Sequence, residues 1–116
     1  MSDQVTLGNV LYPTSDVDAA VTFYAQGLGL PVKFRDGARF AALDGGAITF
    51  AIAGPEEDVA GGRATASFKV AHVARAVDRL IDAGAALVRP AEQGPHEVRA
   101  VLTDPWGNPF VVYGPE

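Results

Sequence analysis

The second half of this sequence repeats the pattern of its first half. Each half contains one segment with the apolar spacing of a helix, at about 16–27 and about 73–83, with one strand-like segment before it and three after it. Val17 and Val73 occupy matching positions 56 residues apart, and the Phe-x-x-x-Gly-Pro segments near the ends of the halves match at a separation of 60. The repeated order restricts the chain to folds built from two β-α-β-β-β units.

Short sequence signals mark the ends of the predicted elements. Ser15 and Asp16 are suited to begin the first helix, Gly27 and Gly29 to end it, and Gly84 to end the second helix. Turn sequences rich in glycine, proline and aspartate separate the strands. The strands are expected in VTLGNVLYPT, PVKFRD, RFAALD and AITFAIA, and then in ATASFKV, ALVRP, EVRAVLTD and PFVVYG.

The two halves are expected to form one domain over residues 1–116. The first module spans about 5–54, the linker about 54–62 and the second module about 63–115. The linker GPEEDVAGG is polar and rich in glycine, and it shows no hydrophobic pattern. Either module alone is too small for a stable core, so the two are expected to share one domain.

Composition excludes several classes of protein. Hydrophobic residues make up 48% of the chain and charged residues 20%, which favours a compact core over disorder. No apolar run approaches about 18 residues and the first residues do not resemble a signal peptide, so we expect a soluble cytoplasmic protein with no membrane partner. A formal charge of −5 argues against nucleic acid as a partner, because nucleic-acid binding needs a basic face. The absence of cysteine excludes disulfides and thiolate sites.

Two segments resemble a known family. SDVDAAVTFYAQGLGL and DPWGNPFVVYGP are similar to characteristic stretches of the vicinal oxygen chelate superfamily, which includes glyoxalases, bleomycin resistance proteins and dioxygenases. The resemblance covers nearly the whole chain. It implies an α+β fold of two tandem βαβββ modules, whose curled mixed sheets form a ligand cup with the helices outside.

The resemblance also locates the positions at which metal-dependent members of the family hold a divalent ion. Those members use histidine or glutamate, but the corresponding positions here are Asn9, Ala51, Thr65 and Val111. Alanine and valine offer a metal no ligand, and threonine is a poor neutral one. We therefore expect a member of the family that lacks the usual ligands and uses no metal and no other cofactor.

The two histidines are not placed as obvious metal ligands either. His72 is expected at the surface, at the beginning of the second helix. His96 and Glu97 follow one another in the loop EQGPHEV, which lies either in solvent or at the rim of the cup. The acidic run Glu56 to Asp58 either attracts a cation or keeps the linker in water. Asp104 is explained by its turn, where its carboxylate accepts hydrogen bonds from the backbone amides that follow.

Strand alternation separates the residues that face the helices from those that line the cup, because successive side chains point to opposite faces. Phe68, Phe110 and Val112 are expected to face the helices. Trp106, in the turn before the last strand, is added to the cup as an aromatic contact. The candidate ligand-binding residues are Asn9, Leu11, Ala51, Thr65, Ser67, Lys69, Trp106, Val111 and Tyr113.

Two of these candidates have alternative roles. Lys69 interrupts an apolar strand, and it either pairs with a carboxylate or phosphate of a ligand, acts as a base, or extends into water. Trp106 either stacks on a ligand or makes a packing or dimer contact. Neither choice follows from the sequence.

The sequence leaves three hypotheses for function. The first is a metal-free small-molecule binding protein resembling the antibiotic resistance members of the family, which sequester a drug such as bleomycin. The alternative is a glyoxalase- or dioxygenase-like enzyme, a lyase or isomerase of a small metabolite, using Lys69, Tyr113 or His96 for acid–base chemistry or a metal site in an unexpected register. The third is a scaffold subunit. A small organic ligand and a homodimer are the expected partners.

Overall fold

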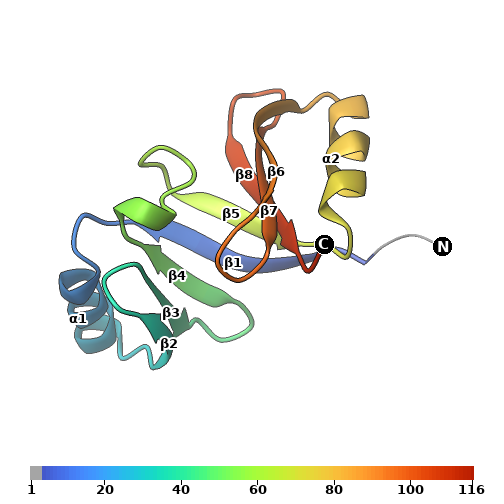
Figure 1. The fold of residues 1–116 in the computed structure, drawn as a ribbon. Coiled ribbons are helices and arrows are strands. Elements are labelled where there is room, and N and C mark those ends of the chain that lie inside the picture. Colours follow the sequence, from blue (N-terminus) through green and yellow to red (C-terminus); the bar gives the residue numbers. More distant parts are fainter. Residues whose placement is uncertain (1–3) are drawn as a thin grey trace. The chain divides into compact units, whose positions relative to one another are not determined.

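The computed structural model describes residues 4–116 as two compact units (Figure 1). The N-terminal unit is Asn9–Thr65. The C-terminal unit is Ala66–Glu116 together with the described residues up to Gly8. The described residues form eight β-strands, two α-helices and one short 3-10 helix. This confirms the α+β class, and the module boundaries expected from the sequence remain a prediction.

The N-terminal unit contains a mixed sheet in the order β2-β3-β4-β1, which is open and not closed into a barrel. Strands β1 and β4 are parallel, whereas β2, β3 and β4 are antiparallel neighbours. The elements are β1 (Thr6–Pro13), α1 (Val17–Leu28), β2 (Val32–Asp36), β3 (Phe40–Asp44), β4 (Thr49–Ala53) and the 3-10 helix η1 (Pro55–Glu57).

The C-terminal unit has the same arrangement, with its strands in the order β5-β8-β7-β6. Strands β5 and β8 are parallel, and β8, β7 and β6 are antiparallel neighbours. The elements are β5 (Thr65–Lys69), α2 (Val73–Asp82), β6 (Ala86–Gln93), β7 (Val98–Thr103) and β8 (Pro109–Gly114).

The helix ends agree with the sequence signals to within a residue. The Asp16 carboxylate accepts a hydrogen bond from the amide of Ala19 at 3.0 Å, which satisfies one of the amides left without a partner at a helix start. Gly29 ends α1 with a φ of 72°, in the left-handed region that favours glycine. Gly84 follows α2 with a φ of 113°.

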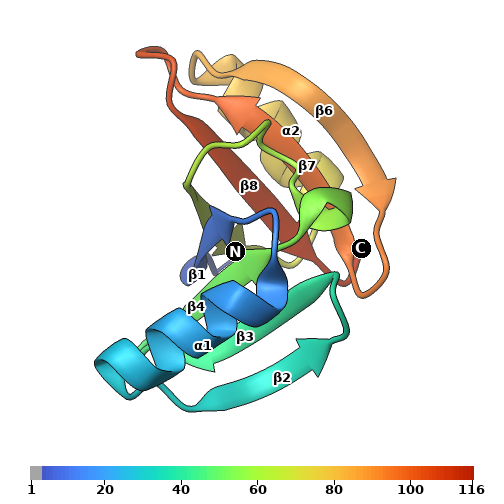
Figure 2. The same cartoon turned by 90° about the vertical axis from the view of Figure 1, so that its left-hand side faces the viewer.

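One helix covers one face of each sheet. In the N-terminal unit α1 lies across β3 and β4, and in the C-terminal unit α2 lies against β7 and β8 (Figure 2). The first core contains Val17 and Val21 of α1 with Ala41, Leu43 and Ile52 of the strands. Burying an aliphatic side chain of the size of valine or leucine stabilises a fold by about 1.5–3 kcal/mol, so the helix is held to the sheet chiefly by this stripe.

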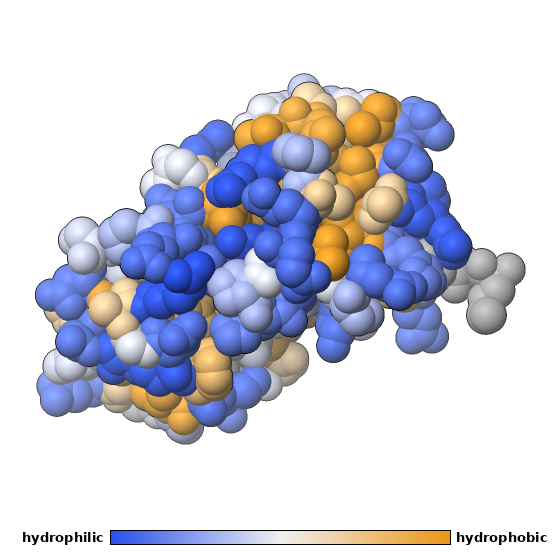
Figure 3. Space-filling view, in the orientation of Figure 1, coloured by the Kyte–Doolittle hydropathy of each residue, from blue (hydrophilic) through white to orange (hydrophobic). Residues whose placement is uncertain are grey.

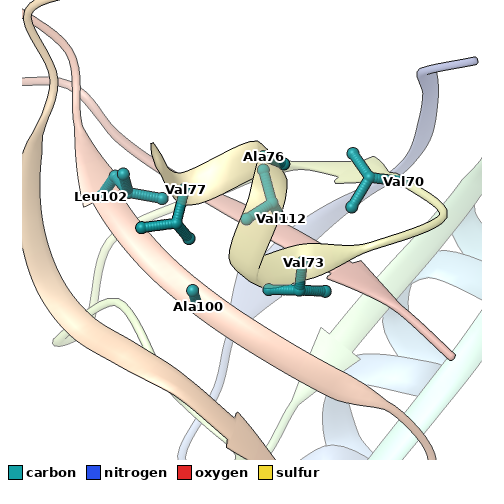
Figure 4. Packing of buried hydrophobic residues seen from close by; sticks show 7 residues of the cluster. All are labelled: Val70, Val73, Ala76, Val77, Ala100, Leu102 and Val112. Carbon is teal, nitrogen blue, oxygen red and sulfur yellow. The ribbon is translucent and has the colours of Figure 1, made fainter. Parts of the chain in front are cut away.

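The core of the C-terminal unit consists of the helix-facing residues of α2, β7 and β8. Phe68 and Phe110 are partly buried against it, which confirms that these strand positions face the helix. The buried cluster is Val70, Val73, Ala76, Val77, Ala100, Leu102 and Val112 (Figure 4).

Strand β6 is the outer strand of its sheet, and all eight of its residues are exposed. Its pairing with β7 shifts register near Arg89 and again before Glu92. Leu87 and Val88 of β6 and Ile81 of α2 are among the exposed large hydrophobic residues. Hydrophobic side chains gather over this part of the molecule in Figure 3.

The linker expected to be a solvated acidic loop is more ordered than its composition suggests. It begins with η1, and Glu57 is buried. The guanidinium of Arg39 forms ion pairs with both Glu56 and Glu57, the second at 3.4 Å from Nε to Oε1. Asp58 accepts a hydrogen bond from the amide of Gly62 at 2.7 Å. The prediction that the acidic run lies in water is therefore wrong for Glu57, because Arg39, in the turn before β3, pairs with its buried carboxylate.

Candidate functional site

The helix-free face of the C-terminal unit carries the first group of candidate residues. The register places Lys69 of β5 beside Tyr113 of β8, and Tyr113 beside Arg99 of β7. Paired residues project from the same face of a sheet, so a lysine, a tyrosine and an arginine lie abreast on three adjacent strands. Phe68, the residue before Lys69 on β5, points to the opposite face and packs on the helix side.

A second row of residues lies next to the first on the same face. Ser67 of β5 pairs with Val111 of β8, which pairs with Val101 of β7. All three are buried. Val111, at one of the positions where metal-dependent relatives have a ligand, thus supplies an apolar surface between a serine and a valine.

A pocket of about 350 Å³ opens at the carboxyl ends of β5 and β8, where Lys69 and Tyr113 lie. In open sheets with parallel strands this is the usual place for a ligand. The loop between β6 and β7 supplies the opposite wall. The lining residues are Lys69, His96, Glu97, Tyr113, Gly114 and Pro115. The three residues considered from the sequence for acid–base chemistry therefore line a single pocket.

Charged groups of both signs surround this pocket. Arg99 Nη1 lies 3.9 Å from Glu97 Oε2, and their side chains are 16% and 29% exposed. The Lys69 side chain is exposed. The Arg99 guanidinium thus lies largely buried beside Tyr113, in a loose pair with Glu97.

Tyr113 reaches across the sheet to Gly8. A Cβ placed on Gly8 would lie 1.8 Å from the Tyr113 hydroxyl oxygen, far inside contact distance. The phenol therefore occupies space that is available only because residue 8 has no side chain. Sequence reasoning missed this role, although a glycine inside the predicted strand VTLGNV is a known signal of close approach by another group.

The N-terminal unit carries a second group of candidates on its own helix-free face. Leu11 of β1 pairs with Ala51 of β4, and Asn9 pairs with Thr49. The Oδ1 atom of Asn9 is buried and accepts no hydrogen bond from any described residue. Lys33 donates a hydrogen bond to the Thr49 hydroxyl at 2.8 Å. A buried acceptor without a donor is costly, so Asn9 offers a docking point for an N–H or O–H group.

Two further candidates are placed differently. The hydroxyl of Thr65 is engaged, since it donates to the carbonyl oxygen of Arg63 at 3.0 Å. Trp106 is 83% exposed in the turn between β7 and β8 and does not line the pocket at Lys69. His72 is the N-cap residue of α2, and its Nδ1 lies 2.7 Å from Oε1 of Glu116. The structure thus brings Ser67, Lys69, Val111 and Tyr113 together and leaves Trp106 apart from them.

The four side chains at the positions compared with the family's metal ligands do not suit a divalent metal. Asn9 offers an amide and Thr65 a hydroxyl that already donates a hydrogen bond, whereas Ala51 and Val111 offer only hydrocarbon. Within residues 4–116, no three side chains of histidine, aspartate or glutamate come close enough together to hold an ion.

The element order and the motif positions correspond to the vicinal oxygen chelate superfamily of α+β proteins. The chain belongs to the glyoxalase-like domain family, whose sequence profile it matches over residues 9–113. An uncharacterized protein of Mycolicibacterium smegmatis is 41% identical over 106 residues, which cover 91% of this chain and 90% of that protein.

Solved structures share the fold. A glyoxalase/bleomycin resistance protein/dioxygenase superfamily member from Vibrio splendidus has a TM-score of 0.69 at 16% identity, covering 97% of this chain and 99% of that one. A methylmalonyl-CoA epimerase from Mycobacterium tuberculosis has a TM-score of 0.73 at 21% identity, covering 95% and 87%. An NAD-dependent benzaldehyde dehydrogenase from Legionella pneumophila has a TM-score of 0.79 at 17% identity, covering 93% and 98%. Identities this low establish the fold and not the activity.

Neither helix in the described part of the chain has the length and apolar character needed to cross a bilayer.

Proposed function

We propose that this protein binds a small organic anion in the pocket at Lys69 and Tyr113, and that it does so without a metal. The observation that carries the proposal is the row formed by Lys69, Tyr113 and Arg99 beside that pocket. Two cations flank one aromatic ring, which suits a carboxylate or phosphate attached to an apolar body.

The proposal includes the arrangement implied by the family. The two β-α-β-β-β runs act as tandem modules, their helix-free faces form the walls of a ligand cup, and the protein works as a homodimer in the cytoplasm. In this respect it resembles the family's drug-sequestering members. The cationic row argues for an anionic ligand over a cationic drug such as bleomycin.

The experiment is calorimetric titration with a panel of carboxylates, phosphate esters, neutral amides and bleomycin, together with zinc, nickel, manganese and iron salts. We expect saturable binding of one anion class, and at least about ten-fold weaker binding by Lys69→Met, because a charge-assisted hydrogen bond contributes about 1.5–3 kcal/mol. Arg75→Met is the control, since it removes a positive charge from an exposed position of α2 that does not line this pocket, and it should bind normally. Binding of a metal alone, or equal affinity in both variants, would contradict the proposal.

A second function is favoured by one specific observation. Lys69, His96 and Tyr113, three residues capable of proton transfer, line one pocket together with Glu97. A lyase or isomerase that moves a proton on the bound anion would use such a set. If a ligand from the titration is converted, His96→Gln is expected to lower kcat with little effect on KM, whereas a protein that only binds shows no turnover in any variant.

A further inference from the structure

A second pocket lies on the opposite, helix-covered face of the C-terminal unit. It has a volume of about 700 Å³, within the range of small-molecule sites, and lies between α2, β5 and β8. Phe68, Phe110 and Leu80 form its apolar walls, and Ala66 and Ala76 add small side chains. Phe68 alternates with Lys69 along β5, so this pocket and the proposed anion site are on different faces of the sheet.

The corresponding place in the N-terminal unit is filled by three aromatic rings. The ring of Tyr24 in α1 lies 4.8 Å from that of Phe50 in β4, and Tyr12 in β1 lies 5.0 Å from Phe50 and 6.5 Å from Tyr24, measured between centroids. All three pairs meet edge to face. This is a favourable geometry, because the positive edge of one ring meets the negative face of the next.

The internal repeat gives the equivalents of these rings in the C-terminal unit. Tyr12 corresponds to Phe68 and Phe50 to Phe110, and these two are again edge to face, with centroids 6.0 Å apart. Tyr24 is the eighth residue of α1, and the eighth residue of α2 is Leu80. Two rings of the trio are therefore present and the third is replaced by an aliphatic side chain.

A further substitution enlarges the same space. Val10 of β1 corresponds to Ala66 of β5, which lines the pocket. The change removes two methyl groups beside the missing ring. Two residues of the second repeat, Leu80 and Ala66, are thus smaller than their equivalents Tyr24 and Val10 and leave more space at this place.

We propose that this pocket binds a small aromatic molecule, whose ring takes the place that Tyr24 occupies in the other unit. Phe68 and Phe110 supply the ring faces and edges that such a ligand requires. Arg79, Asp104 and Asn108 also line the pocket, so a ligand with a hydroxyl or amine substituent has polar neighbours there. Indole and phenol represent this class of ligand.

The test is titration of the full chain with indole and with phenol, followed by NMR of the ring protons of Phe68 and Phe110. We expect saturable shifts of both rings, and at least ten-fold weaker binding of cyclohexanol, which has a hydroxyl but no aromatic ring. Leu80→Tyr supplies the third ring from the chain itself and should weaken indole binding at least ten-fold. Ile81→Tyr, which introduces the same ring at an exposed neighbouring position of α2, should leave binding unchanged.

Several results would overturn the proposal. They are the absence of saturable shifts at millimolar indole, equal binding by the Leu80→Tyr and Ile81→Tyr variants, and equal binding of cyclohexanol. If Leu80→Tyr does not fold, Ala66→Val tests the same point, since it restores the valine of the first repeat. The ring signals of Phe68 and Phe110 could also shift with protein concentration in the absence of added indole or phenol. If that shift is lost in Trp106→Ser, the pocket instead binds the Trp106 side chain of a second copy. Lys69→Met should not affect indole binding, so the outcome is independent of the proposed anion site.

Discussion

Asn108 closes the turn between β7 and β8 by donating hydrogen bonds to both carboxylate oxygens of Asp104. The backbone nitrogen of Asn108 lies 2.9 Å from Oδ1 of Asp104, and its side-chain nitrogen lies 3.0 Å from Oδ2. The backbone amide of Trp106 also donates to Oδ1 at 2.9 Å. These bonds, with the Asn108 backbone amide foremost, lower the pKa of Asp104 below its ordinary value of 3.8.

The lowered pKa predicts a contribution to stability that depends on pH. The folded state favours the ionised carboxylate, so the contribution is fully present well above pH 3.8 and is lost as the pH falls through the lower pKa of the folded state. We expect Asp104→Asn to be less stable than the wild type at pH 7, with the difference shrinking toward pH 3. Urea unfolding across this range measures it, with exposed Asp78→Asn as the control. A difference that stays constant with pH would argue against this cause.

Trp106 lies exposed in the same turn, so a substitution there can distinguish a dimer contact from a contact with a ligand. Because the indole is 83% exposed, Trp106→Ser should change the free energy of unfolding by no more than about 0.5 kcal/mol. If Trp106 makes a dimer contact, sedimentation will show weaker self-association in this variant. Because Trp106 does not line the pocket at Lys69, the affinity for the anion should be unchanged in this variant.

Gly8 is predicted to be required for the position of Tyr113. Gly8→Ala introduces a Cβ into the space of the phenol hydroxyl, and overpacking of this kind destabilises by about 1–3 kcal/mol. Tyr113→Ala removes the obstruction, so the double variant should be more stable than the sum of the single effects implies. Urea denaturation of the four proteins measures this coupling, and strictly additive losses would show that the two residues do not meet.

The buried carboxylate of Glu57 is predicted to contribute more to stability than its exposed neighbour. Both glutamates pair with Arg39, but the Glu57 side chain is 6% exposed and that of Glu56 is 72% exposed. Glu57→Ala should destabilise by about 1–3 kcal/mol, because it leaves a charged donor without its buried acceptor. Glu56→Ala, the matched control, should lie within about 0.5 kcal/mol of the wild type. Similar losses in both variants would contradict the assignment.

Local rules were sufficient for the elements of this fold. Three features could be predicted because each acts over only a few residues. They are the cap at Asp16, the glycine at position 29 and the alternation of Phe68 with Lys69. The burial of Glu57 could not be predicted, since it depends on Arg39, which lies 18 positions earlier, before the two strands β3 and β4. Long-range neutralisation of this kind is invisible to a local pattern.

The candidate site was predictable in part. Alternation placed Ser67 and Lys69 on one face, and the register of β5 with β8 adds Tyr113 beside them. The approach of His96 and Glu97 to that face depends on the path of the loop between β6 and β7, which no periodicity encodes. The helix-side pocket was also missed, although the pairing of Tyr24 with Leu80 follows from the repeat alone.

Strand β6 has a consequence for the behaviour of this protein in concentrated solution. An outer strand with unpaired amides and exposed Leu87 and Val88 is a template on which further chains can polymerise. Pro90 lies in the middle of this strand and has no amide hydrogen, so an added strand would lose a bond at that point. The two shifts of register twist the same stretch further from the flat shape that fibrils need. Pro90 and the two shifts of register are therefore expected to oppose amyloid-like growth together, and Pro90→Val should weaken this protection.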